Sequence, residues 1–396
     1  MQMNYGGDHT VDVHRIFKNF DADETDPASY TFEPTDKYLA TINEAGTKIF
    51  YRLGASIEHG YKFGTYPPKD FHKWARICEY IIRHYTEGWG NGFCYDIEYW
   101  EIWNEADLRN ADGSSPCWQG GREEFYEFYG IAATHLKSCF PHLKIGGPAL
   151  ACCWRSNFNE GFFKYIKKNN IPLDFYSYHC YVKTPEVLLK AVNATEELLK
   201  EFGLEGTETI LDEWNYVKGW LDDDWKESMR TIRNLKGASF NAGCMCVCQD
   251  SPLSMLMYYD ARPGANLNGM FRSEALWECL KGYYPFKMFS KLYQLGRAVE
   301  IQNENSFLYA CAARNDDQAA VMFTYFNTDE TAPSKEVRLQ MQGFGSEKGV
   351  KAEYYLLDET RDLKLVREEC FFTDAFTAIL DTGLYSSYLV VLTKMD

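Results

Sequence analysis

Two patterns of hydrophobic and polar positions alternate along most of the chain. A short apolar run is followed by a segment with helical spacing, and this unit occurs six times. Short apolar runs, the first of them "TKIFYRL" at 47–53, predict buried strands. Each run precedes a segment whose apolar residues recur every three to four positions, which predicts a helix. The predicted strands cover 47–53, 97–102, 143–147, 173–178, 208–212 and 254–259, and the helices 70–87, 122–138, 157–168, 185–202, 225 to the mid-240s and 283–295.

Strands that alternate with helices predict a parallel sheet with helical crossovers, either an open doubly wound sheet or a closed (β/α)8 TIM barrel. No predicted strand is followed by a glycine-rich turn of the dinucleotide-binding or P-loop type. Charged and aromatic residues stand there instead, and a barrel would gather them at one mouth. These residues are Arg52, Glu105, Trp154, His179, Glu213 and Asp260. The pattern therefore favours the α/β TIM barrel.

The pattern changes after about residue 297. Segments such as "QAAVMFTYF" and "SSYLVVLTK" are short, rich in β-branched and aromatic residues, and separated by polar turns such as "GFGSEKG". They predict an all-β sandwich. We therefore expect a catalytic barrel domain over 1–297 and a supporting β-sandwich domain over 298–396.

Composition narrows the partners and the setting. The apolar fraction of 45% is ordinary for a globular protein, and the net charge of −16 disfavours nucleic acid. No apolar run approaches the roughly 20 residues of a membrane helix, and the first residues show no signal peptide. The 13 scattered cysteines favour reduced thiols in a cytoplasmic protein. The "CMCVC" cluster at 244–248 lacks metal-ligand spacing and a nearby histidine, so we predict no metal.

Two short stretches place carboxylates at equivalent strand ends. "YWEIWNEAD" presents Glu105 beside Asn104, and "ETILDEWN" presents Glu213 three strands later. Glycosidic cleavage requires a protonated acid to assist the leaving oxygen and an ionised one to attack the anomeric carbon. Taken singly, each stretch also fits a solvated glutamate with tryptophan in the core, but their matching positions favour a catalytic pair.

Four stretches together resemble one enzyme family. "WEIWNEAD", "LKIGGPAL", "LDFYSYHCY" and "TILDEWN" are similar to successive strand ends of glycoside hydrolase family 39, which contains β-xylosidases and α-L-iduronidases. The resemblance covers about 45–300, and the trailing β-domain is similar to that of the family. The Trp-Asn-Glu motif is shared by a whole retaining clan, whereas "GGPA" with "DFYSYHCY" indicates this family or a near relative.

The resemblance assigns roles to individual residues. It implies that Glu105 is the acid/base, that Glu213 is the nucleophile, and that Asn104 contacts the hydroxyl next to the anomeric carbon. His179 and Tyr181 would line the sugar subsite, with Tyr181 able to hydrogen-bond the nucleophile. For His179 the alternative is a structural histidine at the barrel mouth.

Further substrate contacts are expected from four other residues. Tryptophans such as Trp103 suit the apolar face of a sugar. The last strand lacks the tryptophan that the family often has, so Tyr258 or Tyr259 would replace it. Arg262 could bind a uronate carboxylate, although a salt bridge is the favoured interpretation, and Arg52 could bind substrate or form a buried ion pair.

The resemblance also implies two strands and a helix ahead of the region that matches residues 35–53. Residues 1–34 do not supply them, and only a helix near 35–45 precedes the strand at 47–53. We therefore expect a barrel that lacks its first two strands and exposes unpaired edges. We also expect a form extended upstream to be more soluble or more active.

The expected function is that of a retaining glycoside hydrolase that cleaves terminal bonds of β-xyloside-like substrates by double displacement. Uronides are the alternative substrate class, and a non-catalytic or impaired carbohydrate-binding barrel is the alternative function. The retaining mechanism predicts carboxyl groups about 5–5.5 Å apart. No cofactor is expected, and the partner is an oligosaccharide or glycoside rather than a membrane. A homo-oligomer is possible, because edge strands or the β-domain could mediate contacts between copies of the chain.

Overall fold

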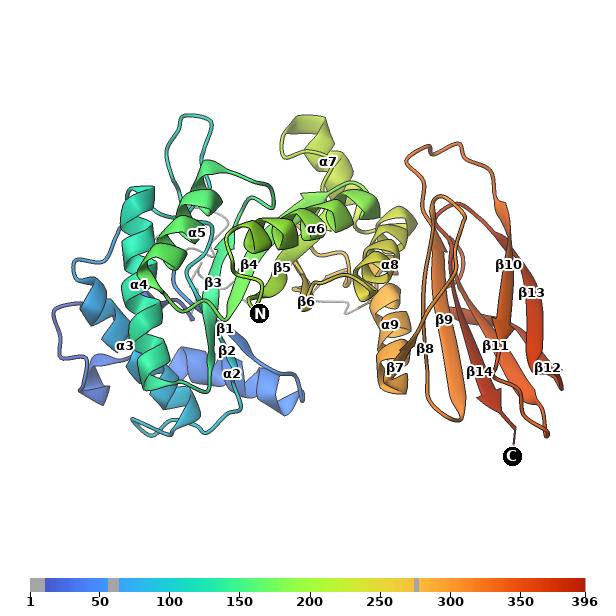
Figure 1. Ribbon diagram of the computed structural model, residues 1–396, viewed down its shortest axis with the longest axis horizontal. Coiled ribbons are helices and arrows are strands. Elements are labelled where there is room, and N and C mark those ends of the chain that lie inside the picture. Colours follow the sequence, from blue (N-terminus) through green and yellow to red (C-terminus); the bar gives the residue numbers. More distant parts are fainter. Residues whose placement is uncertain (1–10, 56–63, 274–277, 396) are drawn as a thin grey trace. The chain divides into compact units, whose positions relative to one another are not determined.

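The computed structural model describes residues 11–55, 64–273 and 278–395. Six strands form one sheet in chain order (Figure 1). β1 pairs with β2, β2 with β3 and β3 with β4, each in parallel. The strands are β1 Phe50–Leu53, β2 Tyr99–Ile102, β3 Lys144–Leu150, β4 Phe175–Val182, β5 Glu208–Tyr216 and β6 Met255–Tyr258. Within the described residues, the parallel sheet therefore has the six strands expected of a barrel without its first two.

Helices separate these strands as the periodicity predicts. In chain order they are α1 Val13–Ile16, η1 Pro27–Ser29, α2 Glu33–Glu44, α3 Phe71–Thr86, α4 Arg122–Cys139, α5 Asn157–Asn169, α6 Pro185–Glu201, α7 Asp222–Thr231, α8 Leu235–Gln249, η2 Lys281–Tyr283 and α9 Tyr284–Leu295. Local sequence sets several of their starts, because Asp70 caps α3 and Ser156 caps α5 through their side chains. Among the described residues, no helix combines the length and the apolar character that crossing a bilayer requires.

One predicted helix was wrong in its continuity. The segment from 225 to the mid-240s holds two helices, α7 and α8, rather than one. The side chain of Asn234 accepts hydrogen bonds from the backbone N–H groups of Lys236 and Gly237, and so it starts a new helix. Asparagine favours this N-cap position over a helix interior, because its side chain competes for backbone hydrogen bonds.

The "GGPA" motif allows β3 to lie close to its neighbours. Gly147 has a φ of +134°, and a Cβ there would lie 2.8 Å from the carbonyl oxygen of Ile102 on β2. A Cβ on Gly146 would lie 2.3 Å from the carbonyl oxygen of Phe175. Side chains at these two positions would therefore push adjacent strands apart.

The last hundred residues form the predicted sandwich. One sheet has the order β12-β11-β14-β9-β8-β7, and β10 pairs with β13 in a second sheet. Apolar residues of both sheets share a single core, which includes Val321, Phe323 and Val390 from the first and Val337 and Leu380 from the second. The strands are β7 Arg297–Val299, β8 Leu308–Arg314, β9 Gln318–Tyr325, β10 Lys335–Gln342, β11 Val350–Leu357, β12 Lys364–Phe371, β13 Ala375–Thr382 and β14 Ser387–Lys394.

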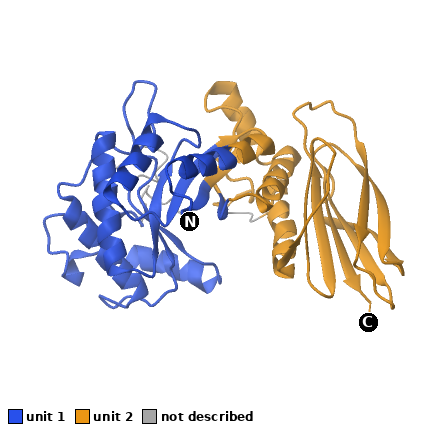
Figure 2. Ribbon diagram, viewed as in Figure 1, with its two compact units in different colours: residues 1–180, 191–212, 253–257 blue, residues 181–190, 213–252, 258–396 orange. Residues whose placement is uncertain are grey.

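The chain divides into two compact units (Figure 2). Unit 1 comprises residues 1–180, 191–212 and 253–257, and unit 2 comprises 181–190, 213–252 and 258–396. The structure has all 13 cysteines as free thiols. That they stay reduced in a cytoplasmic setting remains a prediction. Cys244, Cys246 and Cys248 are buried in α8, where they pack as the sequence indicates.

Candidate active site

Glu105 follows β2 on a backbone that takes an uncommon course. Trp103 has a φ of +75° and Glu105 a φ of +49°, which places both in the left-handed region. The N–H of Trp103 donates to the carbonyl of Leu53 at 2.8 Å, and the N–H of Glu105 donates to that of Ala149 at 2.8 Å. Left-handed non-glycine residues cost on the order of 1–3 kcal/mol each and persist where the surroundings hold them. The ends of β1 and β3 therefore hold the acid in a strained conformation.

The Trp-Asn pair that precedes Glu105 is buried. Trp103 is 1% exposed, its indole N–H donates to the carbonyl of Cys117 at 2.9 Å, and its ring packs against Trp118 and Phe128. Asn104 is 3% exposed. Burial on all sides gives Trp103 a supporting role beneath the acid, and we propose that role in place of sugar stacking.

The side chain of Glu105 contacts His179, which projects from β4. Nδ1 of His179 lies 3.0 Å from Oε1 of Glu105, and Nε2 of His179 lies 3.5 Å from Oδ2 of Asp212. The thiol of Cys117 is 3.7 Å from Oε2 of Glu105. The imidazole is fully buried, whereas the glutamate side chain is 18% exposed. His179 thus lies between a partly exposed acid, at hydrogen-bond distance, and a buried one, at ion-pair distance.

Arg52 lies between two buried carboxyl groups of unit 1. Its Nε donates to Oε2 of Glu101 at 2.6 Å, and its Nη2 donates to Oδ2 of Asp212 at 3.0 Å. The prediction for Arg52 left substrate binding and ion pairing open, and the structure shows the ion pairs. Through Asp212 and His179, this cluster extends to Glu105.

The two carboxyl groups have opposite pKa shifts. Burial, together with the charge of Asp212, raises the pKa of Glu101 to about 7, although Arg52 opposes the shift. Burial also acts to raise the pKa of Asp212, but the positive charges of His179 and Arg52 outweigh it and lower that pKa. As the pH falls, Glu101 therefore takes up a proton before Asp212 does.

The raised pKa of Glu101 predicts a pH-dependent stability. The unfolded carboxyl group has a pKa near 4.5 and the folded one a pKa near 7, so the folded state binds more protons between these values. The free energy of unfolding should therefore fall by up to about 3 kcal/mol as the pH rises through this window. Urea unfolding of the wild type and Glu101→Gln at pH 5 and pH 7 tests this. The variant should lose most of that difference, and an equal difference in both proteins would contradict the prediction.

Asp107 ties the acid-bearing segment to the end of β3. Its carboxylate accepts hydrogen bonds from the backbone N–H groups of Ala151 at 2.8 Å and Cys152 at 3.1 Å. Burial raises the pKa of Asp107, and these hydrogen bonds oppose the shift. Asp107 therefore joins the segment that carries Glu105 to the backbone that follows β3.

In unit 2, Glu213 and Tyr181 are brought together. The hydroxyl of Tyr181 donates to Oε2 of Glu213 at 2.7 Å, and Glu213 is 8% exposed. The indole of Trp220 meets the Tyr181 ring edge-on at 5.0 Å and stacks at 5.5 Å on Trp225. Trp220 is 55% exposed, so an accessible aromatic surface lies beside the tyrosine that holds the candidate nucleophile.

Tyr259 and Arg262 follow β6 in the same unit. The carbonyl of Tyr259 accepts a hydrogen bond from the side-chain amide of Asn215 at 2.8 Å. Arg262 is buried, and its Nη2 lies 3.5 Å from Oδ2 of Asp260, whose Oδ1 accepts the N–H of Arg262 at 3.0 Å. Burial raises the pKa of Asp260, and the arginine opposes that shift. Arg262 therefore forms the salt bridge that the sequence favoured.

The predicted residues thus fall into two groups. Unit 1 holds Arg52, Asn104, Glu105 and His179 in or beside one hydrogen-bonded cluster, and unit 2 holds the Tyr181–Glu213 pair. Glu105 lies in unit 1 and Glu213 in unit 2. The separation of about 5–5.5 Å between their carboxyl groups stays a prediction. The sequence reasoning missed Glu101, Asp107, Asp212 and Trp220. The first and third had a visible signal, because each is a carboxylate inside or at the end of an apolar strand.

A comparison with models of protein families classifies the chain. The model described as glycosyl hydrolases family 39 matches residues 8–225, which is more than half of the chain. The chain belongs to glycosyl hydrolase family 39. The match covers every predicted site residue except the two that follow β6, Tyr259 and Arg262.

The similar curated proteins of this family 39 chain are longer than the matched segments. A β-xylosidase of Geobacillus stearothermophilus is 29% identical over 219 residues, which are 52% of this chain and 40% of the relative. A β-xylosidase of Caldicellulosiruptor saccharolyticus is 29% identical over 165 residues, which are 39% of this chain and 31% of the relative. The chain therefore matches less than half the length of these relatives.

Solved structures support the fold. A glucosidase from Croceicoccus marinus has a TM-score of 0.78 at 21% identity, and the match covers 96% of this chain and 86% of that one. A β-xylosidase from Caulobacter crescentus has a TM-score of 0.72 at 15% identity, with 93% and 85% covered. At these identities the likeness extends to the architecture of barrel and sandwich, which agrees with the predicted fold class.

Proposed function

We propose that this chain is a retaining glycoside hydrolase that removes terminal sugars, with Glu213 as nucleophile and Glu105 as acid/base. One observation carries the proposal. Within the family-matched segment, Glu105 follows β2 and Glu213 lies in the second half of β5. Each has its own partner, His179 for Glu105 and Tyr181 for Glu213. Such separate environments allow two carboxyl groups to keep different protonation states.

In the first step of the proposed mechanism, the Glu213 carboxylate attacks the anomeric carbon while Glu105 donates its proton to the glycosidic oxygen. The bond between that carbon and that oxygen breaks, and a glycosyl ester forms on Glu213. In the second step, Glu105 removes a proton from water, the water oxygen attacks the anomeric carbon, and Glu213 leaves as a carboxylate. Two inversions retain the configuration, and neither step calls for a metal or an organic cofactor.

The neighbouring residues support these roles. The Tyr181 hydroxyl donates to Oε2 of Glu213 and so restrains the orientation of the proposed nucleophile. One ring nitrogen of His179 contacts Glu105, and the other lies near the buried Asp212. We propose that Asn104 contacts the hydroxyl next to the anomeric carbon, in keeping with the family resemblance.

Substitution of Tyr181 tests the nucleophile's environment. Tyr181→Phe keeps the ring and removes the hydroxyl that donates to Glu213. A hydrogen bond to a charged group contributes about 1.5–3 kcal/mol, so kcat/KM should fall about 10- to 150-fold. Steady-state kinetics on an aryl glycoside measure this loss. A change of less than twofold would show that the hydroxyl does not assist the reaction.

We propose β-xylosides as the substrate class, because two similar curated proteins are named β-xylosidases. Uronides have less support, because the guanidinium of Arg262 already pairs with Asp260. Turnover of aryl β-xyloside, β-glucoside, β-galactoside, α-L-arabinoside and α-L-iduronide by the full chain tests the choice. Highest kcat/KM on the xyloside supports it, and highest kcat/KM on the iduronide overturns it.

The non-catalytic alternative is separated by measuring binding and turnover on the same panel. Isothermal titration that detects a sugar without any hydrolysis would favour a carbohydrate-binding barrel and would contradict the hydrolase. Tyr259 is the remaining proposed sugar contact on the segment after β6. The domain boundary at 297/298 and a cytoplasmic setting remain proposals that rest on the sequence patterns.

A further inference from the structure

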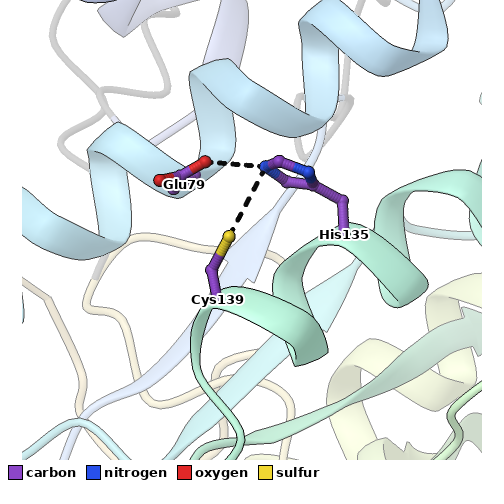
Figure 3. Close-up of side chains that lie close together, drawn as sticks. All are labelled: Glu79, His135 and Cys139. Carbon is purple, nitrogen blue, oxygen red and sulfur yellow. Dashed lines mark hydrogen bonds and ion pairs between the residues drawn. The ribbon is translucent and has the colours of Figure 1, made fainter.

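Three potential metal ligands of different chemistry meet between α3 and α4 in unit 1 (Figure 3). Glu79 projects from α3, and His135 and Cys139 project from successive turns of α4. Nε2 of His135 lies 2.7 Å from Oε2 of Glu79 and 3.8 Å from Sγ of Cys139. The same nitrogen therefore faces both the carboxylate and the sulfur.

We propose that Glu79, His135 and Cys139 bind a zinc-type divalent metal ion, with water as the fourth ligand. Imidazole, thiolate and carboxylate are the three protein ligands that zinc takes, and residues four apart on a helix present their side chains on one face. This site is separate from the proposed hydrolase function, because none of the three residues belongs to the cluster around Glu105 or Glu213.

The distances suit such an ion. Tetrahedral bonds of the usual lengths place nitrogen and sulfur ligands about 3.6 Å apart and nitrogen and oxygen ligands about 3.4 Å apart. The nitrogen–sulfur distance of 3.8 Å already meets this requirement. The nitrogen–oxygen distance of 2.7 Å is that of a hydrogen bond, and it would lengthen by under an ångström when the ion replaces the shared proton.

A second residue prepares the carboxylate. Arg83, one turn after Glu79 on α3, donates to Oε1 of Glu79 and so leaves Oε2 directed at His135. The guanidinium also lies over the ring of Phe140, which follows Cys139. Outer partners of this kind orient the ligands of metal sites. The Glu79–His135 pair joins the two helices, and the four-residue spacing on α4 brings the thiol of Cys139 to the same nitrogen.

The site has an entry path and a structural consequence. The side chains of Glu79 and His135 are 14% and 28% exposed, so an ion can reach them from solvent. An ion there would join α3 to α4, which pack against each other in unit 1. Metal binding should therefore raise the thermal stability of the folded chain.

Cobalt(II), which adopts zinc geometry and reports thiolate ligation by a near-ultraviolet charge-transfer band, provides the test. The full chain is freed of metal with a chelator, titrated with Co²⁺, and compared with Cys139→Ser, His135→Gln and the control Cys94→Ser. Cys94 is an exposed cysteine outside the cluster. Circular dichroism verifies that each variant is folded, and Cys139→Ser alone decides the question if His135→Gln is not.

The wild type and Cys94→Ser should bind one equivalent of Co²⁺ with the charge-transfer band, and the two ligand variants should lose the band. Zn²⁺ should displace the cobalt and raise the unfolding midpoint of the wild type by about 4 °C or more. The site is excluded if the wild type shows no band, or if Cys139→Ser keeps it. Because hydrolysis is not measured, the outcome is independent of the proposed enzyme activity.

Discussion

Replacing Glu213 with glutamine should remove nearly all turnover. The amide cannot attack the anomeric carbon, yet it keeps the shape of the carboxylate and can still accept a hydrogen bond from Tyr181. Removal of a nucleophile from other covalent enzymes lowers kcat by about 10⁴- to 10⁶-fold, and we expect a loss of that order. The measurement is the steady-state hydrolysis of an aryl β-xyloside.

The matched control is Glu205→Gln, which replaces an exposed glutamate just before β5 on the same stretch of chain. Its kcat should equal that of the wild type. A residual activity of Glu213→Gln within tenfold of the wild type would remove Glu213 from the mechanism. Small nucleophiles provide a second check, because azide should restore turnover to Glu213→Gly with inversion at the anomeric carbon.

Replacing Glu105 with glutamine should produce a loss that depends on the leaving group. Proton transfer by a positioned acid contributes about 10²- to 10⁴-fold, so hydrolysis of alkyl glycosides should fall by that order. Dinitrophenyl glycosides need no protonation to depart, so formation of the glycosyl–enzyme ester should remain fast. The absence of the base should then slow the release of that ester. Pre-steady-state kinetics should show a burst.

Azide distinguishes this role from simple misfolding. In Glu105→Gln, azide should accelerate the second step and yield a glycosyl azide of retained configuration, because azide needs no base. Glu123→Gln, on the exposed start of α4, is the control and should behave as the wild type. An equal loss on alkyl and dinitrophenyl substrates would contradict the acid/base assignment.

The order of the elements could be predicted because each depends on local periodicity. Apolar runs and three-to-four-residue spacings predicted the six strands and the helices between them. Short alternating segments predicted the sandwich. The sequence did not predict that one helix would divide into α7 and α8. The apolar pattern continues across the break, which the cap of Asn234 sets. Such boundaries depend on single hydrogen bonds, which periodicity does not report.

For the candidate site, residue type and place at a strand end were sufficient to indicate Glu105, Glu213, Asn104, His179 and Tyr181. The chain alone could not separate the exposed from the buried members of these motifs. Trp103 proved to be packed among aromatic rings, and Arg262 proved to pair with Asp260. Burial and pairing depend on residues far apart in sequence, so a local motif cannot decide them.

The amino-acid order by itself determined the class of fold and the family, because both depend on local patterns and contiguous motifs. It also indicated the candidate pair of carboxylates. Only the tertiary structure decided the ion pairs of Arg52 with Glu101 and Asp212, and the contact of His179 with Glu105. It also brought Glu79 of α3 to His135 and Cys139 of α4. Such contacts join residues 49 to 160 positions apart, and only the folding of the chain sets their distances.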